Sequence, residues 1–239
     1  MPNFPFQRLQ ADLAKLIAKT PAGQRLISEP ELAKQMGVSR ATLREAMRTF
    51  ETQGVIRRRQ GSGTYVVGKI RAIDAGLEKL ESIETMARRM NLEITVSDLH
   101  IEGLDADVDS AKGLGVAEGS RLTRIRRVIR ADRRPAAYLI DTLPETILKP
   151  ADLPGNFHGS VLDFLIERGD KLGISRAVIS ATNAPTDVAK PLEIQRDDVL
   201  LAFTSQLFDI KGAAVVDYSV SYFIPGYFHF HVNRRVGSA

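Results

Sequence analysis

Four residues with hydrogen-bonding side chains, Ser39, Arg40, Thr42 and Arg44, lie close together in the segment GVSRATLREAMRTF. The apolar residues of this segment recur at helical spacing, which leaves the four polar residues near the exposed N-terminal end of an amphipathic helix. An arginine fork pairs with guanine O6 and N7, and helices that read DNA contact base edges from this end. For an isolated helix an ordinary solvated face is the better explanation, so the neighbouring segments decide.

A basic hairpin follows this helix. Residues 55–59, VIRRR, predict a strand that carries Arg58, and residues 64–67, TYVV, predict the return strand. Between them, Gly61 and Gly63 permit a sharp turn and let backbone N–H groups approach a phosphate. A turn of this kind is weak evidence alone, but the adjacent arginines favour DNA binding.

The preceding elements would position the helix and the hairpin. A first helix ends before Pro21, and Ser28 with Glu31 forms a capping box that opens a second helix. Gly37 ends that helix and starts the turn into the arginine-bearing one. Three helices followed by a hairpin make a winged helix-turn-helix, which places one helix in a DNA groove.

The segment SEPELAKQMGVSRATLREAMRTFETQGVIRRRQGSGTYV resembles the DNA-binding domain of the GntR family of bacterial transcription regulators. The resemblance implies that the start of the third helix and the wing, with Ser62, contact operator DNA. Members of the family often carry an arginine where this chain has Pro30, so we expect a different operator. The residues expected to contact DNA are Ser39, Arg40, Thr42, Arg44, Arg58, Gly61, Ser62 and Gly63.

The charge of the chain is unevenly distributed. Residues 1–70 hold 12 Lys and Arg against 5 Asp and Glu, whereas the rest of the chain holds 21 against 24. A basic module joined to a mildly acidic one indicates that only the first meets phosphate.

A second group of informative residues lies on a predicted strand over residues 121–130, RLTRIRRVIR. Because side chains alternate along a strand, Arg127 falls between Ile125 and Ile129 on an apolar face. The opposite face is expected to meet solvent and consists of Leu122, Arg124, Arg126, Val128 and Arg130. A buried arginine needs an anionic partner, and either a protein carboxylate or a bound anionic ligand meets that need.

Two further segments carry polar groups in favourable places. The predicted strand over residues 213–223 puts Asp217 and Ser219 on one face, which suits hydroxyl recognition in a pocket or, alternatively, an exposed sheet face. Ser160 is the expected N-cap of a helix over residues 160–168, and helix N-termini can hold a phosphate or a carboxylate.

The second half of the chain resembles the effector domain of the HutC subfamily of GntR regulators. The resemblance is carried by three segments, LGVAEGSRLTRIRRVIRADRRPAAYLIDTLP, GSVLDFLIER and AVVDYSVSYF. This resemblance implies a chorismate-lyase-like fold that binds a small effector, such as a sugar phosphate, an amino sugar or another small acid. The residues then expected to bind the effector are Ser82, Arg127, Ser160, Asp217 and Ser219. Ile129 and Leu139 replace an arginine and an acidic residue of the subfamily, which predicts a smaller or less charged effector.

The predicted organisation is an α+β chain with two domains. Residues 1–69 form the winged helix-turn-helix, residues 70–77 a linker without periodicity, and residues 78–239 a chorismate-lyase-like domain with an antiparallel sheet. A helix is expected from Leu77 to Arg89.

Other kinds of site are not expected. The chain has no cysteine, which excludes disulfides and cysteine-based metal sites. No apolar run could span a membrane and the N-terminus lacks a secretory pattern, so we expect a cytoplasmic protein. His229 and His231 would share a strand face, as metal ligands can, but the sequence offers no third ligand nearby. We therefore expect neither a metal nor another cofactor.

We thus expect a transcriptional repressor that binds palindromic double-stranded operator DNA as a homodimer. A small, anionic metabolite would switch its affinity for DNA by favouring one arrangement of the two DNA-binding heads. Two alternatives stay open. One is a dimeric DNA-binding protein without a ligand, and the other is a DNA-tethered enzyme of lyase-like fold, for which no catalytic acid–base group is visible.

Overall fold

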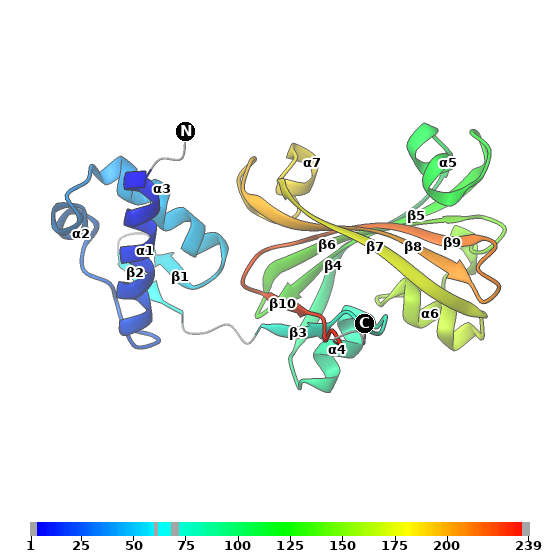
Figure 1. Cartoon of the computed structure of the whole chain (residues 1–239), viewed down its shortest axis with the longest axis horizontal. Coiled ribbons are helices and arrows are strands. Elements are labelled where there is room, and N and C mark those ends of the chain that lie inside the picture. The colour runs from blue at the N-terminus through cyan, green and yellow to red at the C-terminus, as the bar shows by residue number, and fades with distance from the viewer. Residues whose placement is uncertain (1–3, 60–61, 68–71, 236–239) are drawn as a thin grey trace. The chain divides into compact units, whose positions relative to one another are not determined.

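A computed structural model describes residues 4–59, 62–67 and 72–235, and the chain divides into two compact units, Met1–Ala72 and Ile73–Ala239 (Figure 1). The first unit contains α1 (Phe4–Lys19), α2 (Glu29–Met36), α3 (Arg40–Thr52), β1 (Ile56–Arg59) and β2 (Gly63–Val66). The second unit contains β3 (Ile73–Gly76), α4 (Ile83–Arg89), β4 (Ile94–Asp105), α5 (Val108–Leu114), β5 (Arg121–Ala131), β6 (Arg134–Pro144), η1 (Pro150–Asp152), α6 (Val161–Arg168), β7 (Leu172–Asn183), α7 (Thr186–Ala189), β8 (Val199–Asp209), β9 (Val215–Phe223) and β10 (Phe228–His231).

Local sequence signals set the helix boundaries of the first unit. The capping box forms between Ser28 and Glu31, and Gly37 ends α2 with a φ of 66°. Ser39 Oγ accepts a hydrogen bond from the backbone N–H of Thr42 and so starts α3. The apolar faces of the three helices and the hairpin close over one core. The predicted winged helix-turn-helix is confirmed.

The second unit is built on a six-stranded antiparallel sheet with the strand order β4-β5-β6-β9-β8-β7. Figure 1 shows α4 and α6 on one face of this sheet and α5 and α7 on the other. Under α6, Val161 and Leu165 pack against Ile125 of β5. Under α5, Leu114 packs against Leu122 of the same strand. The predicted α+β class with an antiparallel sheet is confirmed.

The expectation that one face of residues 121–130 meets solvent is wrong. Leu122 and Val128, both on that face, are 0% exposed. Arg124, between them, donates a hydrogen bond to Ser110 Oγ at 3.2 Å, just inside α5. Helices cover the sheet on both sides (Figure 1), so Leu122 on this face belongs to a second apolar core, while Arg126 stays partly exposed, at 35% of its side chain.

The connector is shorter than predicted. Residues 73–76, expected to lie in the linker, form β3 and pair in parallel with β10, with Phe228 opposite Ile73 and His231 opposite Gly76. The following helix begins at Ile83, after its N-cap Ser82, and not at Leu77. The strand depends on a partner near the other end of the chain, so its own residues carry no periodic signal.

Candidate DNA-binding and effector sites

The four polar residues at the start of α3 lie together and are exposed. Ser39 caps the helix, and its hydroxyl lies 2.8 Å from the hydroxyl of Thr42. Arg40 and Arg44 stand on the same exposed end, and the Arg44 side chain is 54% exposed. The buried stripe of the helix faces the core, so this end is free to meet a DNA groove.

A carboxylate missed by the sequence analysis links this helix to the wing. Glu29, the first residue of α2, accepts from Arg44 Nε at 2.7 Å and lies 3.3 Å from Arg58 Nε. Arg58 also approaches Glu51, at 3.9 Å. These contacts hold Arg44 and Arg58 together at the surface. Glu29 follows the capping serine directly, but only the fold brings it to both arginines.

The wing is an antiparallel hairpin in which Arg58 pairs with Thr64. Gly63 has a φ of 111°, and a Cβ on it would lie 2.4 Å from Arg25 Nε, so the turn requires glycine here. Ser62 Oγ lies 2.7 Å from the hydroxyl of Tyr65. Gly61, also expected to contact DNA, lies outside the described residues.

In the second unit, Arg127 has protein partners. It is 4% exposed, between the fully buried Ile125 and Ile129. Its guanidinium pairs with the carboxylate of Asp141 on β6 and lies 3.5 Å from Glu84 on α4. Although burial lowers the pKa of the guanidinium, these carboxylates raise it above its ordinary value. The structure thus displays the protein-carboxylate alternative for this arginine.

Asp141 also corrects an inference about β6. The subfamily resemblance places an acidic residue at the position of Leu139, which is paired with Arg127 in the sheet register. Asp141 lies two residues further on, on the same face, and reaches Arg127 diagonally. Strand alternation could have found it, because residues two apart share a face.

Asp217 and Ser219 lie beside Asp141. Ser219 is the direct register partner of Asp141, and Asp217 accepts a hydrogen bond from the backbone N–H of Thr142 at 3.1 Å. Asp217 is 8% exposed. Its burial, together with the nearby charge of Asp141, raises the pKa of its carboxyl well above the ordinary value. On this face of β9, Asp217 is therefore buried and Ser219 is partly buried, so the face is not an exposed one.

A third carboxylate joins the two predicted serines. Ser82 Oγ donates to Asp163 Oδ2 at 2.6 Å, and Thr85 Oγ1 donates to the same oxygen at 3.2 Å. The backbone N–H of Asp163 donates in turn to Ser160 Oγ at 3.1 Å. Ser82 caps α4 and Ser160 caps α6, so Asp163 ties the starts of these two helices together.

The two groups of contacts share helix α4, which carries Ser82 and Glu84 near its first turn. The five residues predicted to bind an effector therefore lie near one another, on the face of the sheet that α4 and α6 cover (Figure 1). Both carboxylate oxygens of Glu84 and the Nε of Arg127 are buried without a hydrogen-bond partner among the described residues. Buried polar atoms of this kind leave hydrogen-bonding capacity for a further group.

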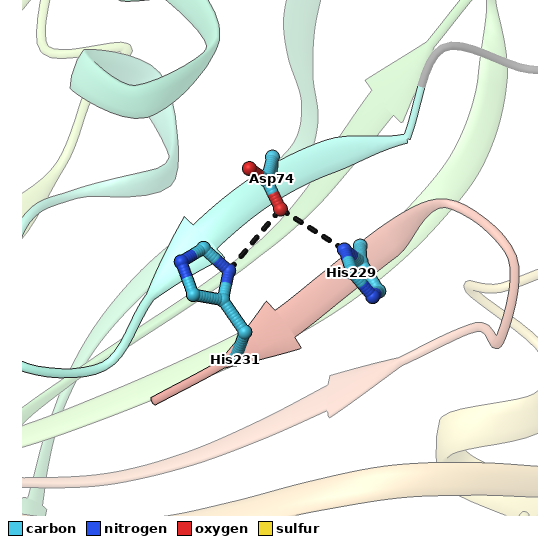
Figure 2. A group of neighbouring side chains, drawn as sticks. All are labelled: Asp74, His229 and His231. Carbon is cyan, nitrogen blue, oxygen red and sulfur yellow. Dashed lines mark hydrogen bonds and ion pairs between the residues drawn. The ribbon is translucent and has the colours of Figure 1, made fainter. Parts of the chain in front are cut away.

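The two histidines near the C-terminal end have a third neighbour. Asp74, on β3, lies beside His229 and His231 of β10 (Figure 2). The premise that no third ligand lies nearby was wrong, because Asp74 is close only through the pairing of β3 with β10.

Along the described part of the chain, no helix is long and apolar enough to cross a membrane.

Comparison with known proteins agrees with these two units. The chain matches the family model "UTRA domain" over residues 89–229 and "Bacterial regulatory proteins, gntR family" over residues 6–66. The HTH-type transcriptional repressor NagR of Bacillus subtilis (strain 168) is 28% identical over 193 residues, covering 79% of this chain and 77% of that protein. The mannosyl-D-glycerate transport/metabolism system repressor MngR of Escherichia coli (strain K12) is 27% identical over 199 residues, covering 82% and 81%.

The crystal structure of PhnF from Mycobacterium smegmatis has the same fold, with a TM-score of 0.65 at 20% identity, over 96% of this chain and 100% of that one. A winged helix-turn-helix joined to an effector-binding sheet domain defines a ligand-responsive, DNA-binding transcription regulator and not an enzyme. The chain belongs to the GntR family of bacterial regulatory proteins, in the group that carries a UTRA domain.

Proposed function

We propose that this protein is a homodimeric repressor whose affinity for an inverted-repeat operator is switched by a small metabolite. DNA binding is assigned to residues 1–69, and effector binding and dimerisation to residues 78–239. The observation that carries the proposal is the exposed start of α3, where Arg40 and Arg44 project from the more basic unit. A regulator of this kind works in the cytoplasm, where its operator is.

On DNA, Arg40 and Arg44 contact base edges or phosphates, with Ser39 and Thr42 beside them at the helix start. Arg58, Gly61, Ser62 and Gly63 of the wing contact the backbone or the minor groove. The position of Glu29 supports this assignment, because it holds Arg44 and Arg58 at 2.7 Å and 3.3 Å. A DNA phosphate offers the same charge and can take over one or both arginines.

The dimer contact is assigned to the edge strand β7. Ile174 is 70% exposed, Val178 58% and Ile179 46%, all on one strand at the edge of the six-stranded sheet. An edge strand with exposed β-branched residues invites pairing or packing with another chain unless it is covered. A second copy covering it in a two-fold dimer would match the symmetry of a palindromic operator.

The effector is proposed to bind at Ser82, Arg127, Ser160, Asp217 and Ser219 as a small acid that also carries hydroxyl or amino groups. An acidic group would approach Arg127, but it must share that guanidinium with Asp141 and Glu84. Donor groups on the effector would supply the hydrogen bonds that the carboxylate oxygens of Glu84 lack beside their ion pair with Arg127. The name of the relative MngR points the same way, since mannosyl-D-glycerate is a hydroxylated acid.

The alternative of a dimeric DNA-binding protein without a ligand has one observation in its favour. The ion pairs of Arg127 with Asp141 and Glu84 account for its charge without any bound anion. In that case Arg127 stabilises the domain and the DNA-binding units have no chemical switch.

The test begins with selection of DNA from a random pool by the full chain, followed by fluorescence anisotropy with the selected site. Small hydroxy acids, amino sugars and sugar phosphates are then screened for a raised melting temperature, since a ligand at a hundredfold excess over Kd adds about 2.7 kcal/mol. A ligand that stabilises the protein and weakens operator binding supports the proposal. Selection of an operator without any stabilising ligand favours the ligand-free alternative, and failure to select an operator contradicts the whole assignment.

A further inference from the structure

A group of metal-ligating side chains lies where the first and last strands of the second unit meet. β3 and β10 pair in parallel, with His229 opposite Asp74. Figure 2 shows one carboxylate oxygen of Asp74 between the rings of His229 and His231. The group contains none of the residues proposed to bind the effector or DNA, so neither of these functions explains it.

The spacing of the ligand atoms matches a metal site. Asp74 Oδ1 lies 3.0 Å from His229 Nδ1 and 3.2 Å from His231 Nδ1, and each of the three residues offers a ligand atom within 4.8 Å of those of the other two. Bonds of about 2.0–2.1 Å to a tetrahedral or octahedral ion separate neighbouring ligand atoms by about 2.9–3.4 Å. A single ion therefore fits this group with only small side-chain movements.

Hydrogen bonding within the group leaves one ligand atom unused. His229 Nδ1 and Asp74 Oδ1 form a hydrogen bond. His231 Nδ1 is buried and has no hydrogen-bond partner among the described residues, although it faces the same oxygen. A buried ring nitrogen without a hydrogen bond is costly, and a metal ion would use its lone pair.

A further carboxylate lies near His231. A Cβ placed on Gly76 would lie 2.7 Å from Glu78 Oε2 and 3.4 Å from His231 Nε2, so both groups lie close to Gly76. The negative charge of Glu78 near this ring favours a bound cation. Glu78 is held in turn by the backbone N–H of Asn233.

We propose that Asp74, His229 and His231 form a binding site for a divalent transition-metal ion such as Zn²⁺. Two imidazole nitrogens and one carboxylate oxygen suit Zn²⁺, Ni²⁺ or Co²⁺ and not Mg²⁺ or Ca²⁺, which prefer oxygen ligands. The Asp74 and His229 side chains are 54% and 74% exposed, so water fills the remaining coordination positions. The ion would join β3 to β10. Each of these strands has four residues, and they lie far apart in the sequence of the unit.

The test uses the full chain without an affinity tag, stripped of metal with a chelator. Isothermal titration with Zn²⁺ is expected to show one ion per chain, and Zn²⁺ is expected to raise the melting temperature. Co²⁺ should give visible absorption of a site with nitrogen and oxygen ligands. Asp74→Asn and His229→Ala are each expected to weaken Zn²⁺ binding by at least about tenfold, the lower end of what outer partners alone cost.

The matched control is His158→Ala, which removes an exposed histidine from the loop before α6 and should bind Zn²⁺ as the parent chain does. His229 is itself exposed, so His229→Ala keeps the fold, as circular dichroism can verify. Zn²⁺ binding that is absent from the parent chain, or equally strong in His229→Ala and Asp74→Asn, would overturn the proposal. Operator binding is measured separately, so failure here does not bear on the proposed regulatory function.

Discussion

The DNA-binding unit and the effector unit use their key arginines in opposite ways. Arg44 has a side chain that is 54% exposed, and among the described residues it forms an ion pair with one carboxylate, that of Glu29. Arg127 has a side chain that is 5% exposed and lies between two carboxylates from different elements. Solvent screens the first pair and not the second, so the two arginines are expected to matter for different properties.

This difference bears on how each unit performs its task. An exposed arginine with a weakly held partner can exchange that partner for phosphate when DNA arrives. A buried arginine that exchanges its partner must leave a carboxylate behind, which costs free energy unless the ligand satisfies that carboxylate too. Under the proposed assignment, an effector that pairs with Arg127 would need donors for the released carboxylates as well as an acidic group, whereas the DNA-binding unit would need only a polyanion.

The largest expected effect is on stability. Arg127→Met leaves Asp141 and Glu84 buried without their cation and should lower the free energy of unfolding by about 3–5 kcal/mol. Urea unfolding measures the change. The control is Arg121→Met, on the same strand as Arg127. It breaks an exposed ion pair with Asp105 of β4 and should cost about 0.2–1 kcal/mol. Equal losses in the two variants would remove the energetic contrast between buried and exposed pairs.

The next effect is on DNA binding. Arg44→Ala should weaken specific operator binding by about 5- to 150-fold, a loss of about 1–3 kcal/mol, while the melting temperature stays near that of the parent chain. Fluorescence anisotropy against the selected operator measures the loss. Arg88→Ala removes an exposed arginine from α4 in the other unit and should leave operator affinity unchanged. Undiminished binding by Arg44→Ala would contradict the recognition-helix assignment.

A smaller effect is expected from Asp217→Asn. Burial and the charge of Asp141 raise the pKa of Asp217 in the folded state, so the folded protein keeps a proton that the unfolded chain releases. The stability it contributes is full below the ordinary aspartate pKa and is lost as pH rises through the raised value. Asparagine mimics the protonated carboxyl and should raise the melting temperature at neutral pH by about 2–4 °C, for a gain of about 1 kcal/mol.

Thermal unfolding of both proteins over a series of pH values tests this prediction. The stability difference between Asp217→Asn and the parent should shrink as pH falls toward the ordinary aspartate pKa. A difference that is constant with pH would mean that Asp217 is ionised in the fold, and the proposed effector chemistry would then have one more negative charge to satisfy.

The two units also differ in how far their structures follow from sequence. In the first unit, Ser28, Gly37 and Ser39 set helix boundaries through contacts with residues a few positions away, so the helices and the exposed arginines could be predicted. The residue that joins Arg44 to Arg58 could not, because Glu29 reaches them only after the helices pack.

In the second unit, alternation on β5 predicted that Arg127 is buried, which the structure confirms, but not which partner it has. Asp141 approaches through strand pairing and Glu84 through the packing of α4 on the sheet. For the same reason the sequence predicts a linker where β3 lies, because these four residues form a strand only beside β10. Contacts between distant segments decided each of these features, and one sequence carries no direct record of them.

The smallest expected effect concerns Glu29, the carboxylate that contacts both Arg44 and Arg58. Glu29→Gln removes the carboxylate that competes with phosphate for Arg44 and Arg58, so operator affinity should rise by up to about fivefold, the value of an exposed ion pair. The rise should be largest at low salt, where phosphate contacts contribute most. A fall in affinity instead would mean that Glu29 holds both arginines in the geometry that DNA requires, and that this exposed pair positions side chains as firmly as the buried one around Arg127.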